Sequence, residues 1–150
     1  MSKVITAKLV GIAYREGGKR PMQTLEIADI TVERGIVGDS RGKPGKRQVT
    51  ILSVESWLTA CEELGIQLSW LNRRANLLIE GYEFGQSDVG KVICVGDARL
   101  EITRETDPCR RMDQVHKGLK KALMPDWRGG VCCRVLDGAE VSVGVAVDFS

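Results

Sequence analysis

The chain has 150 residues, of which 43% are hydrophobic and 28% are charged, a composition typical of one soluble globular domain spanning residues 1–150. A formal net charge of only +2 disfavours a dedicated nucleic-acid binder, and an aromatic content of 5% offers few stacking platforms for single-stranded bases. The N-terminal MSKVITAKLVGIAYREGGKR has no long apolar segment and no window approaches a membrane span, so we expect a cytoplasmic protein with neither nucleic-acid nor membrane partners.

Strand patterns dominate the chain. Strands are predicted over residues 4–14, 24–33, 47–52, 74–80, 91–95, 98–104, 131–138 and 139–149. A phase slip at Ala28-Asp29 indicates a bulge in the second strand. The dipeptides Gly96-Asp97 and Asp137-Gly138 are hairpin turn signals. The last strand would place Val141, Val143, Val145 and Val147 on one face.

Two helices are expected. Ser53 is a preferred N-cap residue, and Gly65 suits the end of the helix that follows. The apolar stripe between them comprises Val54, Trp57, Leu58, Cys61 and Leu64. The second helix is expected from about Arg110 to Leu123, and its apolar positions are Met112, Val115, Leu119 and Leu123.

The many short strands and few helices predict a mainly β fold, a curled or closed β-barrel of mostly antiparallel strands with a few short helices. A long loop from Arg34 to Arg47 is basic and rich in glycine. Long loops of this kind are often functional or mobile.

One thiol has an unusual setting in the stretch ETDPCRRM. Asp107 is a good N-cap and Pro108 suits the first helical position, which would place Cys109 in the first turn of a helix. The unpaired N–H groups of that turn and the two following arginines favour thiolate over thiol. The thiolate is the nucleophile and the metal ligand, so Cys109 is the candidate reactive residue. The alternative is a capped helix whose exposed cysteine has no chemical role.

The other four cysteines look structural. Cys61 lies on the stripe of the first helix and Cys94 lies inside an apolar strand, so we expect both in the core. Cys132 and Cys133 are neighbours in a strand, so one should face the core and the other a groove or solvent. We expect reduced thiols, and the absence of paired cysteine spacings disfavours structural zinc.

Two segments concentrate groups that suit an anion. SRGKPGKRQ offers basic side chains, including Arg47, and two glycines, although it lacks the ending of a Walker loop. NRRANLLIEG places Arg73, Arg74 and Asn76 directly before an apolar strand. Arginine grips phosphate or carboxylate with paired hydrogen bonds, and asparagine both donates and accepts. Solvated loops are the simpler interpretation of each segment taken alone. Beside Cys109 they suit a ligand with a phosphate at one end and a thiophilic centre at the other.

The order of these segments resembles the MOSC domain, the family named after the C-terminal region of molybdenum cofactor sulfurases. The matching pieces are GIVGDSRGKPGKRQVTIL, RRANLLIEG, VGKVICVGDARLEITRETDPC and GGVCCRVLDGAEVSVGVAV. They cover the chain from about Thr24 to its end, and their order and spacing are more specific than any single piece. The resemblance implies a mainly β, curled barrel with a few helices.

The resemblance also implies a chemistry. Cys109 matches the cysteine thought to carry sulfur as a persulfide or to ligate molybdenum, so it would be the catalytic residue and the molybdenum ligand. Arg47, Arg73, Arg74 and Asn76 match positions that would hold the phosphate of a molybdopterin cofactor. The implied function is handling of the molybdenum cofactor, by binding it or by transferring persulfide sulfur to a molybdenum centre. The chain would then act as a sulfurtransferase or as a component of a molybdenum-dependent reductase.

The sequence departs from the family pattern in the loop after Gly-Asp. Family members often carry a histidine there, where this chain has Arg41 or Lys43, so the sequence offers no histidine base at that place. We expect no pyridoxal-phosphate desulfurase domain and no extra N-terminal domain like that of amidoxime-reducing relatives. The expected partners are therefore a separate sulfur donor such as a cysteine desulfurase, a molybdoenzyme or a redox partner.

Two other functions are also consistent with the sequence. The barrel could be a non-catalytic module that presents a basic groove to an anionic ligand or a partner protein. It could also be a thiol redox sensor, in which Cys132 or Cys133 would be the resolving cysteine.

Overall fold

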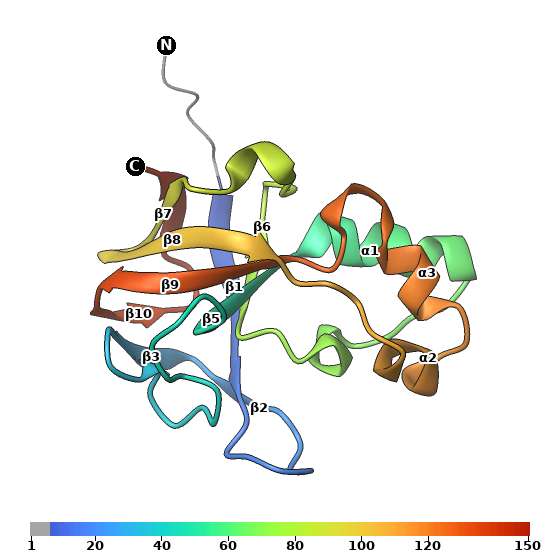
Figure 1. Cartoon of the computed structure of the whole chain (residues 1–150), viewed down its shortest axis with the longest axis horizontal. Helices are drawn as coiled ribbons and strands as arrows, with labels where there is room; N and C mark the ends of the chain where they lie inside the picture. Colours follow the sequence, from blue (N-terminus) through green and yellow to red (C-terminus); the bar gives the residue numbers. More distant parts are fainter. Residues whose placement is uncertain (1–6) are drawn as a thin grey trace.

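Strands form most of the regular structure in the computed structural model, which describes residues 7–150 (Figure 1). The strands are β1 (Ala7–Tyr14), β2 (Gln23–Leu25), β3 (Ile27–Thr31), β4 (Gly35–Ile36), β5 (Val49–Ser53), β6 (Leu77–Glu80), β7 (Val92–Val95), β8 (Ala98–Glu105), β9 (Val131–Asp137), β10 (Ala139–Ser142) and β11 (Ala146–Phe149). The helices are α1 (Val54–Leu64), α2 (Arg111–Val115) and α3 (Leu119–Leu123), with 3-10 turns η1 (Trp70–Arg73), η2 (Gln86–Asp88) and η3 (Pro125–Trp127). The start of the strand expected from Val4, residues 4–6, lies outside the described residues.

The main sheet closes on itself. Its strands follow the order β11-β7-β8-β9-β5-β6-β1, and β1 pairs back with β11. β5 and β6 run parallel, and the other pairs around the ring are antiparallel. β2 continues the sheet beyond β1, and β10, β3 and β4 form a separate small sheet. The predicted closed, mostly antiparallel β-barrel is confirmed.

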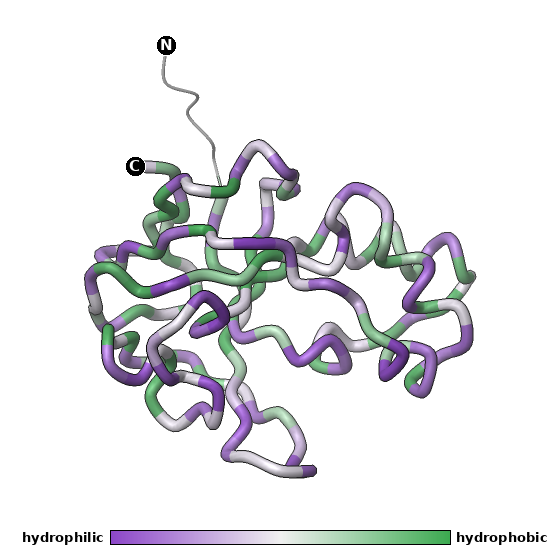
Figure 2. Tube along the Cα trace, in the orientation of Figure 1, coloured by the Kyte–Doolittle hydropathy of each residue, from purple (hydrophilic) through white to green (hydrophobic). Residues whose placement is uncertain are grey.

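The strands β5 and β6 each contribute side chains to two hydrophobic cores, one inside the barrel and one under the helices. Ile51 of β5 and Leu77 of β6 belong to the barrel core, whereas Leu52 and Leu78 belong to the core under the helices. Side chains alternate across a strand, so a continuous apolar run is buried on both faces. The apolar strands cross the centre of the molecule, and polar residues lie along the loops (Figure 2).

The helices gather on one side of the barrel (Figure 1). Their shared core contains Trp57 of α1, Met112 of α2 and Leu119 of α3. No helix within residues 7–150 is long and apolar enough to cross a membrane.

The first predicted helix is confirmed. The Ser53 Oγ accepts a hydrogen bond from the Ser56 N–H at 3.4 Å, and Gly65 ends α1 with φ 66°. Trp57 is buried as expected, but Leu58 is exposed, so the buried stripe is narrower than the sequence indicated.

The second predicted helix is wrong in two respects. Gly118, with φ 91°, separates α2 from α3, and the Asp113 Oδ1 accepts the Lys120 N–H at 3.1 Å where the chain turns into α3. At the other end, α2 begins at Arg111 without a side-chain cap. Asp107 instead pairs with Arg104 at 3.0 Å. Cys109 therefore precedes the helix and does not lie in its first turn, contrary to the prediction.

The last predicted strand is also divided. Gly144 has φ 104° and lies in a turn between β10 and β11. β10 pairs with β3 in the small sheet and β11 pairs with β7 and β1 in the barrel. Val143 and Val145 thus lie outside the strands, although all four valines pack against the barrel core. The run from Thr24 breaks at Glu26 rather than at Ala28-Asp29, because β2 and β3 pair with different neighbours.

Candidate functional site

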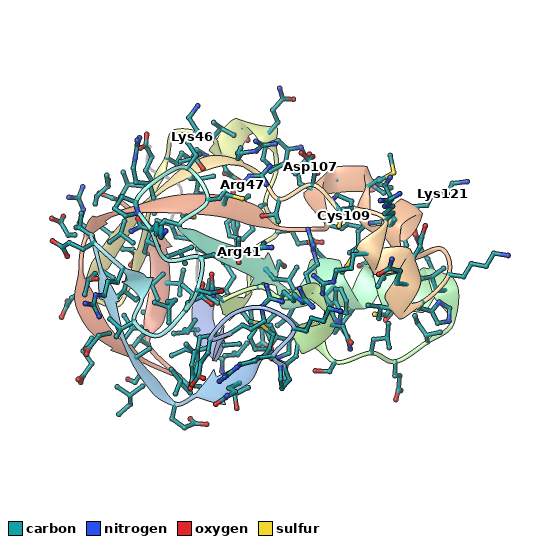
Figure 3. All side chains as sticks on the ribbon, turned by 60° about the horizontal axis from the view of Figure 1, so that its bottom comes forward. Arg41, Lys46, Arg47, Asp107, Cys109 and Lys121 are labelled. Carbon is teal, nitrogen blue, oxygen red and sulfur yellow. The ribbon has the colours of Figure 1, made fainter. Side chains whose placement is uncertain are left out.

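A cavity of about 880 Å³ brings together all five predicted site residues, which are Cys109, Arg47, Arg73, Arg74 and Asn76. Its walls come from the end of β1, the 39–47 loop, the residues before β6, the segment after β8 and the strand β9. Figure 3 shows Cys109 on the segment between the barrel and the helices, with Arg41, Lys46 and Arg47 on the loop that faces it.

Cys109 is an exposed thiol on a segment without regular structure. Its carbonyl oxygen accepts the Met112 N–H at 2.9 Å, which connects the segment to α2. Of the two arginines that follow it, Arg111 lines the cavity, whereas Arg110 is exposed and lies outside the lining.

Arg73 fixes the segment that carries Cys109. Its side chain is buried, its Nη2 donates to the Thr106 carbonyl at 2.8 Å and its Nε donates to the Gly129 carbonyl at 3.1 Å. Burial lowers the pKa of Arg73, and the nearby Cys109, followed by Cys132, opposes this shift. A Cβ on Gly129 would lie 2.7 Å from the Thr106 carbonyl oxygen and 3.0 Å from the Arg73 Nη2, so this arrangement requires a glycine.

Asn76 uses its side chain to join three strands. Its Oδ1 accepts the Thr50 N–H at 3.0 Å, and its Nδ2 donates to the Ala13 carbonyl at 3.2 Å. Its own N–H donates to the Thr50 carbonyl at 3.1 Å. Asn76 therefore builds the cavity wall where β1, β5 and β6 meet, and a contact of its amide with a ligand stays a prediction.

Arg74 and Arg111 belong to a cluster of guanidinium groups. Burial lowers the pKa of Arg74, and repulsion from Arg111, Arg15 and Arg41 lowers it further. Burial also lowers the pKa of Arg111, opposed by Cys109. Cations held this close together repel one another, and an anion among them would relieve that repulsion.

Arg15 belongs to the lining of the candidate site, although the sequence did not indicate it. Its side chain is only 8% exposed, lines the cavity, and has an Nη1 without a hydrogen-bond partner within the described chain. Its backbone N–H donates to the Asp39 Oδ1 at 3.0 Å, and its carbonyl accepts the Ser40 N–H at 2.8 Å. In the sequence, Arg15 opens the polar stretch REGGKR and looks like an exposed turn residue, so no local signal indicates its burial.

The long basic loop is held in place by Gln48. The Gln48 Nε2 donates to the Val32 carbonyl at 2.6 Å and to the Gly42 carbonyl at 3.1 Å, and its Oε1 accepts the Val135 N–H at 2.9 Å. A Cβ on Gly42 would lie 1.6 Å from the Arg34 carbonyl oxygen, so the loop can pack here only with a glycine. These contacts fix the loop that carries Arg41, Lys43, Lys46 and Arg47 to the cavity.

The other cysteines divide as expected, with one exception. Cys61 and Cys133 are buried, and burial raises the pKa of each thiol. Cys132 is buried on the opposite face of β9 from Cys133 and lines the cavity. The prediction for Cys94 is wrong, because its side chain is only partly buried.

A second hollow adjoins the cavity. It has a volume of about 550 Å³, shares Lys46 and Asp107 with the cavity, and is also lined by Glu105 and Trp127. Burial and the neighbouring Asp107 raise the pKa of the Glu105 carboxyl.

The MOSC domain family matches residues 27–148, which include the 39–47 loop, the 73–76 segment and Cys109. The chain belongs to the MOSC domain family. No curated protein matches this MOSC domain significantly in sequence.

Solved structures share its fold. The YuaD protein from Bacillus subtilis superimposes with a TM-score of 0.80 at 20% identity, covering 99% of this chain and 98% of that one. YiiM from Escherichia coli gives a TM-score of 0.69 at 15% identity, covering 95% and 69% of the two chains. YiiM from Geobacillus stearothermophilus gives 0.69 at 17% identity, covering 96% and 75%. At these identities the likeness establishes the MOSC fold alone.

Proposed function

We propose that this MOSC domain handles the molybdenum cofactor, with Cys109 as its molybdenum ligand or persulfide carrier. The observation that carries the proposal is the pairing of an exposed thiol with a cluster of guanidinium groups in one cavity. The cofactor has the same two ends, a phosphate and a metal centre that binds sulfur. When bound, it supplies a molybdenum centre for sulfur or oxygen transfer.

The residues in the cavity fit this group. A buried guanidinium nitrogen without a partner is costly, and the Arg15 Nη1 is such an atom. A phosphate oxygen beside it would accept a charge-assisted hydrogen bond. Arg74 and Arg111, whose charges repel each other, would gain from the same anion.

In this proposal, the residues of the cavity have separate roles in binding the phosphate and positioning Cys109. Arg15, Arg74 and Arg111 hold the phosphate, and Arg47 contributes from the facing loop. Asn76 shapes the wall between the strands. Arg73 positions the segment that presents Cys109, through the Thr106 and Gly129 carbonyls.

Sulfur has to reach Cys109 from another protein in this proposal. The donor is a separate cysteine desulfurase or another persulfide-bearing protein, and the acceptor is a molybdoenzyme. In the alternative reaction, reduction at the molybdenum centre, a redox partner takes the place of the donor.

Titration of the purified chain with isolated molybdopterin cofactor tests the proposal. We expect Arg74→Ala to weaken binding and Cys109→Ala to lose molybdenum while the pterin still binds. Arg110→Ala is the matched control, because Arg110 is exposed and lies outside the cavity lining. Molybdenum retention that is unaffected by Cys109→Ala, together with binding that is lost in Arg74→Ala, would identify a non-catalytic anion-binding module instead.

A further inference from the structure

The cavity contains a second thiol to which the proposed function gives no role. Cys132 lies on β9 and lines the same cavity as Cys109. Cys61, Cys94 and Cys133 do not line it. Within the described chain, two thiols therefore share one cavity.

Thr106 and Arg73 connect the surroundings of the two thiols. The Thr106 hydroxyl lies 3.3 Å from the Cys132 sulfur, and the Thr106 carbonyl accepts the Arg73 Nη2 at 2.8 Å. Arg73 in turn interacts electrostatically with both Cys109 and Cys132. The Thr106 hydroxyl can donate a hydrogen bond to the Cys132 sulfur, and the buried Arg73 holds the Thr106 carbonyl in the segment that leads to Cys109.

Cys109 and Cys132 differ in their local structure. The segment from Asp107 to Arg110 lies outside every strand and helix, whereas Cys132 is held in β9 between β5 and β8. A disulfide needs Cβ atoms about 4 Å apart. The bond proposed below requires the segment from Asp107 to Arg110 to bring Cys109 to this distance from Cys132.

We propose that Cys132 is a second catalytic thiol, which attacks a persulfide on Cys109 and releases its outer sulfur as hydrosulfide. This inference rests on the persulfide-carrying form of the proposed function. The Cys132 thiolate forms a bond to the Cys109 Sγ, and the bond between that Sγ and the outer sulfur breaks. The electron pair of the broken bond leaves with the outer sulfur, which is reduced to hydrosulfide, while the Cys132 sulfur is oxidised to the disulfide. The proton of the Cys132 thiol passes to water, so the sum is persulfide plus thiol giving disulfide plus hydrogen sulfide.

The disulfide between Cys109 and Cys132 blocks both thiols until the disulfide is reduced. Cys109 can then neither accept another sulfur atom nor ligate a metal, and a dithiol reductant has to restore both thiols. A persulfide carrier that meets no acceptor would thus release its outer sulfur as hydrosulfide and stay inactive until the disulfide is reduced.

The experiment uses the full chain loaded with inorganic polysulfide, freed of excess reagent and kept without added thiol. We expect about one equivalent of hydrosulfide per chain, trapped with monobromobimane, because a persulfide attacked by one thiol releases one hydrosulfide. Intact mass should fall to two hydrogens below that of the reduced protein, and peptide mapping should link Cys109 to Cys132. Dithiothreitol should restore the starting mass.

Three variants separate Cys132 from the other thiols. Cys132→Ser should keep the extra sulfur atom on Cys109, and Cys94→Ser, which removes a thiol outside the cavity, should release hydrosulfide like the wild type. Thr106→Val keeps Cys132 and a side chain of similar shape. It should slow release on the order of tenfold, because it removes one hydrogen bond to an anionic sulfur.

Hydrosulfide release from Cys132→Ser at the wild-type rate, a wild-type chain that keeps its persulfide, or one that takes up no sulfur would overturn this inference. Cofactor titration of the same preparation keeps the two proposals distinguishable. A chain that binds the cofactor but retains its persulfide contradicts only the role of Cys132. A chain that releases hydrosulfide through Cys132 but binds no cofactor contradicts only cofactor handling.

Discussion

Replacing Arg15 with methionine should stabilise the ligand-free protein and weaken its binding of phosphate. Methionine keeps an unbranched apolar side chain in the buried position but removes the guanidinium charge. The hydrogen bonds that Arg15 makes with Asp39 and Ser40 involve its backbone, so they persist in Arg15→Met.

The expected changes in stability and in phosphate affinity both follow from the unpartnered Nη1 of Arg15. Relief of one buried, unsatisfied polar group is worth about 1–3 kcal/mol, which corresponds to a rise in Tm of roughly 3–9 °C for a chain of this size. Loss of one charge-assisted hydrogen bond to an anion costs about 1.5–3 kcal/mol, so the affinity for pyrophosphate should fall roughly 10- to 150-fold.

Urea unfolding and calorimetric titration with pyrophosphate measure the two effects on the same preparation. Arg20→Met is the control, because the exposed Arg20 pairs with Glu16 at 2.7 Å on the surface and such pairs contribute about 0–1 kcal/mol. It should leave pyrophosphate binding unchanged. An Arg15→Met protein that is less stable than wild type and binds pyrophosphate equally well would refute the role given to this guanidinium.

Three further predictions concern the framework of the site. Gly129→Ala should destabilise the chain by about 1–3 kcal/mol in urea unfolding, because the added Cβ would crowd the Thr106 carbonyl and Arg73. Gly85→Ala is the control and should cost less than about 1 kcal/mol, because a Cβ at Gly85 would meet open space. Equal destabilisation by the two substitutions would contradict the close packing at Gly129. Iodoacetamide under native conditions should modify the exposed Cys109 before the other cysteines, and peptide mapping after short reaction times measures this order. Earlier modification of Cys133 would contradict its burial. The raised pKa of Glu105 means that its contribution to stability is fully present below the pKa of the unfolded chain and is lost as the pH rises through the higher folded pKa. Glu105→Gln should therefore gain stability relative to wild type between about pH 4 and pH 7, and a constant difference across this range would contradict the shift.

The barrel and its first helix could be predicted because their signals are local. Alternating apolar residues identify most strands, and Ser53 and Gly65 identify both ends of α1. The closure of the barrel follows less directly, since pairing of β1 with β11 joins the two ends of the chain.

The errors arise where tertiary contacts decide the local structure. Asp107 has the chemistry of a helix cap but pairs with Arg104, so the helix starts after Cys109. Four alternating valines suggest one long strand, but the turn at Gly144 sends the chain from the small sheet into the barrel.

The candidate site was likewise predictable where the signals are local and not where tertiary contacts decide. The sequence predicts five site residues, and the fold brings them to one cavity: Cys109, Arg47, Arg73, Arg74 and Asn76. Their separate tasks could not be predicted, because the backbone carbonyls that hold Arg73 come from Thr106 and Gly129, which are distant in the chain. The burial of Arg15 likewise depends on where the fold places the end of β1.

The molybdenum content of the purified chain tests the central claim most directly. Protein isolated from cells supplied with molybdate would be compared with its Cys109→Ala variant by elemental mass spectrometry, with pterin measured by fluorescence in the same samples. Molybdenum ligation by Cys109 predicts molybdenum and pterin in the wild type, and pterin without molybdenum in the variant. Equal molybdenum in both proteins would contradict this ligation, and neither component in the wild type would contradict cofactor handling itself.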